Sequence, residues 1–142
     1  VVLEWFLKGK NKKMEEEKEF LKQRAIFCGL PNVWVMYKDI PYLVFGYGAG
    51  RLELLTSPLS SCTYPEAPLI KEVQVILRKE EDLNEEEKKE YTKIGMTDEL
   101  EDWMNIHCVD HRDLISRGWA VDAASLGDKN PYKYGVCFGG LI

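Results

Sequence analysis

The sequence lacks the cysteine and histidine patterns that mark most metal sites and many nucleophilic enzymes. Its four cysteines lie far apart and form no Cys-x-x-Cys pair: Cys28, Cys62, Cys108 and Cys137. The only two histidines, His107 and His111, have no zinc-finger spacing. We therefore expect no metal and no cofactor, and we expect four reduced, mostly packed thiols, as in a cytoplasmic protein.

Two further absences limit the partners of the chain. There is no excess of positive charge: the net charge is −5 and the sequence pI is about 5.2, whereas binding to a phosphate backbone needs a basic face. No apolar run approaches the roughly 20 residues that span a bilayer, and the opening segment VVLEWFLKGKNKK is too short and too charged for a secretion signal. The sequence therefore predicts no membrane partner and disfavours nucleic acid.

What is present is the composition of one globular domain. Hydrophobic residues make up 45% and charged residues 30% of the 142 residues, which is a typical balance for such a domain. Residues 1–13 hold four lysines and one glutamate, a charge of +3, which leaves −8 for the rest of the chain. We therefore expect the natural product to begin at Met14, with residues 1–13 as upstream reading frame. We expect a single α+β domain over residues 14–124 and a terminal extension over 125–142.

The first part of this domain predicts one short helix and then a small sheet. Residues 14–24, MEEEKEFLKQR, have an acidic start that suits the positive end of a helix dipole. Runs of β-branched, aromatic and leucine residues joined by turns then predict four strands, which fall at residues 33–38, 41–48, 51–57 and 69–77. Four short strands over residues 30–78 favour a small antiparallel SH3-like sheet or barrel.

The last third predicts a helical subdomain over residues 83–120. Asn84 and Glu87 form a capping-box pattern at the start of one helix. Thr97 starts the next helix, whose apolar stripe has the spacing i, i+3, i+4, i+7 and consists of Leu100, Trp103, Met104 and His107. We expect the first three residues of this stripe and one face of the sheet to bury each other.

A third, short helix is predicted after Asp110, whose carboxylate can cap it. It would end near Arg117, with Gly118 in the left-handed position that closes a Schellman motif. Trp119 would then fold back onto Leu114. This segment is therefore expected to depend on its caps and on tertiary contacts, because one or two helical turns are not stable alone.

The densest group of reactive side chains is the run from His107 to Asp113. A cysteine near histidine and aspartate could act as an activated nucleophile, and two histidines four residues apart could share a metal on a continuous helix. However, adjacent residues on a helix point about 100° apart, so His107 cannot serve Cys108 directly. Asp110, as a cap, would break the helix before His111. We therefore assign no catalytic residue and expect this run to be structural.

Aromatic side chains are concentrated in the predicted sheet, and two interpretations of them stay open. Some could form an exposed strip that docks a peptide, because tyrosine combines a rigid apolar ring with a polar tip. The candidate partner-binding residues are four tyrosines: Tyr37, Tyr42, Tyr47 and Tyr64. The alternative is that the sheet aromatics all serve as core, as at least half of them must in so small a barrel.

Four phrases of the sequence occur in an order that resembles a group of small proteins from phages and prophages of gut bacteria: WVMYKDIPYLV, RLELLTS, VQVILRKEEDLNEEEKKEY and HCVDHRDLISRGWAVDA. That group opens with W-V-x-Y-x-x-x-P-Y and closes with H-x-D-Y-R-G-L-I-x-x-G-L-A. The similarity covers residues 33–124, and the present sequence differs from the closing phrase at His111, Asp113 and Trp119. The resemblance implies a location in the bacterial host cytoplasm and a shared fold rather than an activity.

These observations lead to one expected function and two alternatives. We expect a non-enzymatic accessory protein of a phage or prophage that binds another protein. The first alternative is a small hydrolase that uses His107, Cys108 or His111, which would require a reactive thiol or a bound metal. The second is a nucleic-acid-binding barrel, which the charge of −8 beyond residue 13 disfavours.

Overall fold

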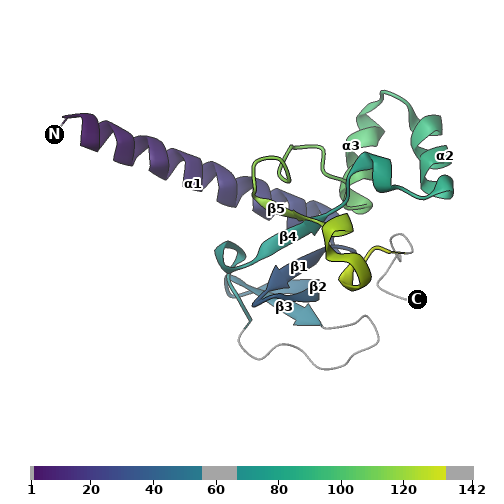
Figure 1. Ribbon diagram of the computed structural model, residues 1–142, viewed down its shortest axis with the longest axis horizontal. Helices are drawn as coiled ribbons and strands as arrows, with labels where there is room; N and C mark the ends of the chain where they lie inside the picture. Colours follow the sequence, from purple (N-terminus) through teal and green to yellow (C-terminus); the bar gives the residue numbers. More distant parts are fainter. Residues whose placement is uncertain (1, 56–66, 134–142) are drawn as a thin grey trace.

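A computed structural model describes residues 2–55 and 67–133 of the chain. It confirms the α+β class: one five-stranded sheet is flanked by helices (Figure 1). The strands lie in the order β3-β2-β1-β4-β5, and every neighbouring pair is antiparallel except β4 and β5. The sheet is open in the part of the chain that the structure describes, so an SH3-like barrel is not confirmed.

The first helix, α1, is much longer than the sequence predicts. It runs over Val2–Gly29 instead of residues 14–24 and passes through Met14 without a break. Lysine is a good helix former, so the basic stretch before Met14 continues the helix. From Glu17, which pairs with Arg117 (3.2 Å), α1 lies against the rest of the protein. Residues 2–16 stand away from the sheet (Figure 1), and we call them the projecting half of α1.

The predicted strands are confirmed, with small changes in their bounds. The observed strands are β1 (Trp34–Tyr37), β2 (Ile40–Gly48), β3 (Arg51–Leu55) and β4 (Gln74–Leu77). The first three form a meander, and β4 returns to pair with β1 on its other side. The last strand is shorter than predicted because its first residues form a 3₁₀ turn, Ile70–Glu72.

The main core lies on one face of this sheet. Alternate residues of the strands point to the same face, and the buried ones are Val35, Tyr37, Tyr42, Val44, Leu52, Leu54, Val75 and Leu77. The C-terminal part of α1 belongs to the same cluster through Ala25 and Ile26. Full burial of one such aliphatic side chain stabilises the fold by about 1.5–3 kcal/mol.

A fifth strand, β5 (Ala120–Asp122), pairs in parallel with β4. A strand of three residues leaves almost no pattern in the sequence, and it was not predicted. It leads into a 3₁₀ segment, Ala123–Lys129. Beyond that segment, the Tyr132 hydroxyl donates a hydrogen bond to the Ile76 carbonyl (3.0 Å) and accepts one from the Trp34 N–H (2.8 Å). The residues after β5 are thereby tied to β1 and β4.

Two helices, α2 (Glu85–Ile94) and α3 (Asp98–Ile106), form a small second core. Its buried members are Leu83, Trp103 and Val109, and Tyr91, Ile94 and Met104 pack against them. The prediction that the α3 stripe and the sheet bury each other is therefore wrong. Trp103 and Met104 of the stripe pack with residues of α2 instead, because the short turn between the two helices brings their apolar residues together.

Candidate functional site

The run from His107 to Asp113 is held against the end of β4. His107 directly follows α3 as its C-terminal cap, and Cys108 takes a positive φ of 57°, which turns the chain away from the helix. Arg78 then binds this segment through its own backbone. Its N–H donates to the Cys108 carbonyl (2.8 Å), and its carbonyl accepts from the Asp110 N–H (2.8 Å). The candidate residues are thus anchored to the sheet rather than presented on a helix.

A buried ion pair lies next to this segment. Arg78 and Glu87 are 2% and 6% exposed, and the guanidinium donates two hydrogen bonds to the carboxylate, one of them 2.9 Å long from Nη1 to Oε1. Such bidentate pairs combine charge with fixed geometry. Arg78 Nη2 also donates to the His107 carbonyl (2.8 Å). The pair therefore joins β4, α2 and the end of α3.

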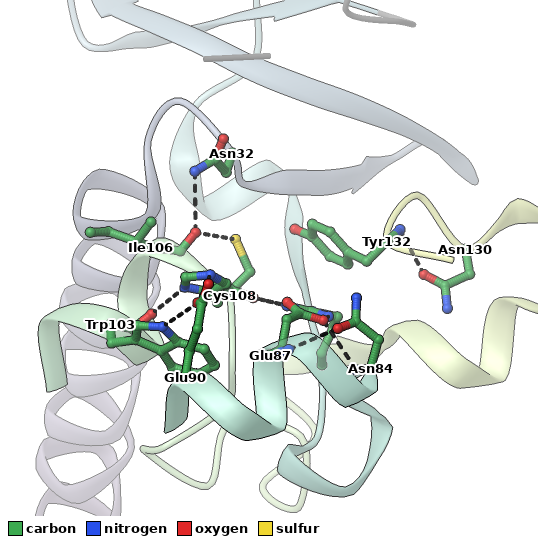
Figure 2. Close-up of polar contacts among 11 residues, drawn as sticks. Asn32, Asn84, Glu87, Glu90, Trp103, Ile106, Cys108, Asn130 and Tyr132 are labelled. Atoms are coloured by element: carbon green, nitrogen blue, oxygen red, sulfur yellow. Dashed lines mark hydrogen bonds and ion pairs between the residues drawn. The ribbon is translucent and has the colours of Figure 1, made fainter. Parts of the chain in front are cut away.

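Glu87 has a second role, at the start of α2, where the predicted capping box is confirmed. Asn84 Oδ1 accepts from the Glu87 N–H (2.8 Å), and Glu87 Oε1 accepts from the Asn84 N–H (3.1 Å) (Figure 2). Burial alone would raise the pKa of Glu87, but the hydrogen bonds and charge of Arg78 hold it below its ordinary value. The carboxylate is therefore kept ionised by its structural partners.

His107 packs on its own helix, as expected of a structural residue. Its ring stacks on Trp103 with 4.0 Å between centroids, and its Nδ1 lies 2.9 Å from the Trp103 carbonyl oxygen. Its Nε2 lies 3.7 Å from Glu90 Oε2, which also accepts a hydrogen bond from Trp103 Nε1 (Figure 2). Burial lowers the pKa of His107. The ring is thus a neutral packing element at neutral pH.

Cys108 and His111 do not combine into a nucleophilic site either. Cys108 is 2% exposed, and burial raises its pKa to about 11, with a smaller opposing effect from Tyr132. A thiol in this state supplies almost no thiolate. His111 Nε2 lies 2.7 Å from Asn105 Oδ1, which also accepts from Arg112 Nη2 (3.0 Å). Within residues 2–55 and 67–133, no group of three histidine, cysteine or acidic side chains is arranged to hold a metal.

The predicted cap at Asp110 is confirmed, but the helix that it was expected to cap is absent. Its carboxylate accepts from the Leu114 N–H (Oδ1, 3.0 Å) and from the Ile115 N–H (Oδ2, 3.0 Å). Residues 114–118 form turns instead of a helix, and residues 111–113 have no regular secondary structure. Asp113 has a positive φ of 56°, which an α-helix cannot contain. The predicted helical subdomain to residue 120 is therefore wrong beyond α3.

The predicted turn at Gly118 is also confirmed. Gly118 has a φ of 75°, its N–H donates to the Ile115 carbonyl (3.0 Å), and the Trp119 N–H donates to the Leu114 carbonyl (2.8 Å). This is the hydrogen-bond pattern of a Schellman motif, formed here without a regular helix before it. The motif reverses the chain into β5 and packs Trp119 against the main core.

Two of the four candidate partner-binding tyrosines cannot form an exposed strip. Tyr37 and Tyr42 are buried in the main core, at 8% and 4% exposure. Tyr47 is 46% exposed, and its ring makes an edge contact with Phe27 at 5.0 Å. Tyr64 lies outside the described residues. The interpretation as core is therefore right for Tyr37 and Tyr42, and Tyr47 remains accessible by itself.

A run of exposed apolar side chains lies on α1 instead. Leu3, Trp5, Met14 and Phe20 are 69%, 77%, 50% and 55% exposed. The first three belong to the projecting half (Figure 1). Sequence reasoning missed this surface because it set residues 1–13 apart from the domain. The signal was present in the sequence, since leucine, tryptophan and methionine occur in this helix among many charged residues.

Comparison of the chain with protein-family models, curated proteins and solved structures found no significant match. In the described ranges, 2–55 and 67–133, none of the helices combines the length and apolar character needed to cross a membrane. A function of this chain must therefore be inferred from its own geometry, and from the exposed side chains of α1 in particular.

Proposed function

We propose that this chain is a non-enzymatic accessory protein of a phage or prophage, which binds another protein through the projecting half of α1. The observation that carries the proposal is the exposure of Leu3, Trp5 and Met14 on a helix that stands away from the sheet. The resemblance of residues 33–124 to small phage and prophage proteins supports the biological setting, which is the cytoplasm of a bacterial host.

The physical reason is that a helix owes most of its stability to packing. Isolated helices of fewer than about 12–15 residues are marginal in water, because nucleation is costly. The side chains of Leu3 and Trp5 bury little of their surface in the described protein. Burying such side chains on a partner would contribute about 1.5–3 kcal/mol each, and tryptophan is enriched among residues that dominate binding energy.

The two alternative functions lack such support. The hydrolase would need a reactive thiol or a free imidazole, whereas Cys108 is protonated by burial and both histidine rings are held by structural contacts. The nucleic-acid barrel would need a continuous basic face. On α1, the lysines of residues 8–13 are followed, after Met14, by the four glutamates of residues 15–19, so this helix offers no such face.

The proposal can be tested by protein capture from lysate of the bacterial host with the full chain immobilised. We expect a defined protein to be retained by the wild type and lost with the double substitution Leu3→Ser and Trp5→Ser. Met96→Ser is the matched control, because Met96 is 96% exposed but lies between α2 and α3. The proposal would be contradicted if no protein is retained above background at several salt concentrations, or if the α1 variant retains the same proteins.

A further inference from the structure

The projecting half of α1 contains a block of positive charge, and a block of negative charge follows it. Residues 8–13 hold four lysines, and residues 15–19 hold four glutamates and one lysine, with Met14 between the two blocks. These charged side chains are exposed, except that Lys18 is half-buried. Because a helix rises about 1.5 Å per residue, both blocks lie within about 17 Å along α1.

The order of the blocks decides which pairing of two α1 helices is favourable. In a parallel pair in register, lysines would face lysines and glutamates would face glutamates. In an antiparallel pair centred on Met14, the basic block of each helix faces the acidic block of the other, on both sides of a two-fold axis. Complementary charges of this kind set the orientation and register of helix pairs.

The same arrangement covers two of the apolar side chains that α1 exposes, Trp5 and Phe20. At about 100° per residue, Trp5, Lys12, Glu16 and Phe20 share one side of α1 and Met14 points to the opposite side. The two helices therefore cross at the level of Met14 but meet through the side that carries Trp5. Trp5 then lies opposite residue 23 of the second copy, one helical turn from Phe20 of that copy. Exposed ion pairs contribute little to affinity, so the buried apolar side chains supply most of the binding energy and the charges select the antiparallel arrangement.

We infer that two copies of the chain associate through antiparallel pairing of their α1 helices, centred near Met14. This inference rests on the proposed function, because both take the projecting half of α1 as a protein-binding surface. The other possible occupant of this surface is a different protein that presents a complementary helix, and the experiment below separates the two.

The experiment measures the association of the full chain by analytical ultracentrifugation over a range of concentrations. One variant carries Lys12→Glu and Lys13→Glu, and the other carries Glu15→Lys and Glu16→Lys. In the inferred pair, position 12 faces position 16, and positions 13 and 15 flank this contact. Each variant alone therefore replaces the attraction between positions 12 and 16 with repulsion. We expect the wild type to dimerise and each variant alone to dimerise at least about tenfold more weakly.

Mixing the two variants gives the decisive result. One chain is then acidic at all four positions and the other is basic, so we expect an equimolar mixture to form a heterodimer at least as tight as the wild-type dimer. Lys88→Glu with Lys89→Glu makes the same change of charge on α2 and should leave association unchanged. High salt should weaken the mixed dimer more than the wild-type dimer.

Two outcomes would overturn the inference. If the wild type is monomeric at every concentration, α1 does not pair with itself. If the wild type dimerises but both variants dimerise equally well, another surface forms the dimer. Neither outcome decides the proposed function, because capture of a different protein that is lost with the Leu3 and Trp5 substitutions would still support it. Loss of both dimerisation and capture would remove both proposals.

Discussion

At the scale of single residues, Arg78 connects several elements of the fold, although the sequence did not mark it as a candidate site residue. Its guanidinium pairs with Glu87 on α2, donates to the His107 carbonyl at the end of α3, and lies over the Tyr132 ring at 5.6 Å. Removing one partner of a buried ion pair leaves the other as an uncompensated charge in a medium that solvates it poorly. The structure of the second core therefore depends on the Arg78–Glu87 pair.

We expect Arg78→Met to lower the free energy of unfolding by about 3–5 kcal/mol, because Glu87 would stay buried without its partner. The double substitution Arg78→Met with Glu87→Met should recover much of this loss. Urea denaturation of the two single variants and the double variant measures the coupling. Lys79→Met is the control, since the ion pair of Lys79 with Asp122 lies at the surface and should contribute little to stability. Equal losses of stability for Arg78→Met and Lys79→Met would contradict the claim that the buried Arg78–Glu87 pair stabilises the fold.

Stability should also fall as the solution is acidified from neutral pH. Burial lowers the pKa of His107 and of His111 below 6.5, so the unfolded chain binds protons that the folded chain does not. The free energy of unfolding therefore decreases as the pH falls below about 6.5 and levels off below the folded pKa values. Glu87 contributes above pH 4.5, and its contribution is lost as the pH falls through its lowered pKa.

Urea denaturation between pH 7.5 and pH 5 measures the histidine contribution, in buffers of about equal ionic strength. We expect the slope to become smaller when His107→Gln or His111→Gln removes one titrating ring. A wild-type stability that rises on acidification over this interval would show that the histidines are stabilised in their charged forms, and it would contradict the burial argument.

At the scale of elements, the turn at Gly118 sets the direction in which the chain enters β5. Its carbonyl accepts a hydrogen bond from Gln74 Nε2 (3.0 Å), so the turn is also tied to β4. Gly50, at the tip of the β2–β3 hairpin, has a similar φ of 78° but lies in the open turn between two strands. The same substitution at the two glycines therefore compares the Gly118 turn, which is hydrogen-bonded to β4, with the hairpin turn at Gly50.

We expect Gly118→Val to lower the free energy of unfolding by about 2 kcal/mol or more, because a β-branched residue at positive φ is strained and Trp119 would lose part of its packing. Gly50→Val should cost less, since the hairpin tip can relax. Thermal and urea denaturation of both variants give the comparison. A smaller effect at position 118 than at position 50 would mean that the Schellman motif does not hold β5 in place.

The elements that the sequence predicted well are those with strong local signals. The four strands follow from alternating apolar residues and tight turns, and the capping box of α2 and the Schellman motif follow from residue types at fixed spacing. Asp110 was correctly predicted as a cap. Nothing in the sequence indicated that Asp113 would take a positive φ. This conformation is incompatible with the expected helix, and turns form there instead.

The features that could not be predicted depend on contacts between distant parts of the chain. Arg78 is recognisable only as a basic residue at the end of an apolar strand, and nothing in the sequence names Glu87 as its partner. β5 forms because residues 120–122 pair with β4, which is distant from them in the sequence. The burial of Tyr37 and Tyr42 depends on which face of the sheet α1 covers, and strand alternation leaves that choice open.

At the scale of the whole molecule, the chain has a packed body and one helix that extends beyond it. The body has two cores, one on the sheet and one between α2 and α3, and the buried Arg78 connects them. The projecting half of α1 adds no packing to either core in the described protein (Figure 1). Its exposed apolar residues and its block of lysines are the features that the body does not use.

The most direct test of this account is amide hydrogen exchange of the full chain, measured in dilute solution and again with the projecting half occupied, either at high concentration or with a captured protein. We expect residues 2–16 to exchange fast in the dilute chain, because an unpacked helix opens easily. They should become protected on binding, while α2 is unchanged. Identical exchange of residues 2–16 in both states would contradict the claim that this surface binds a protein.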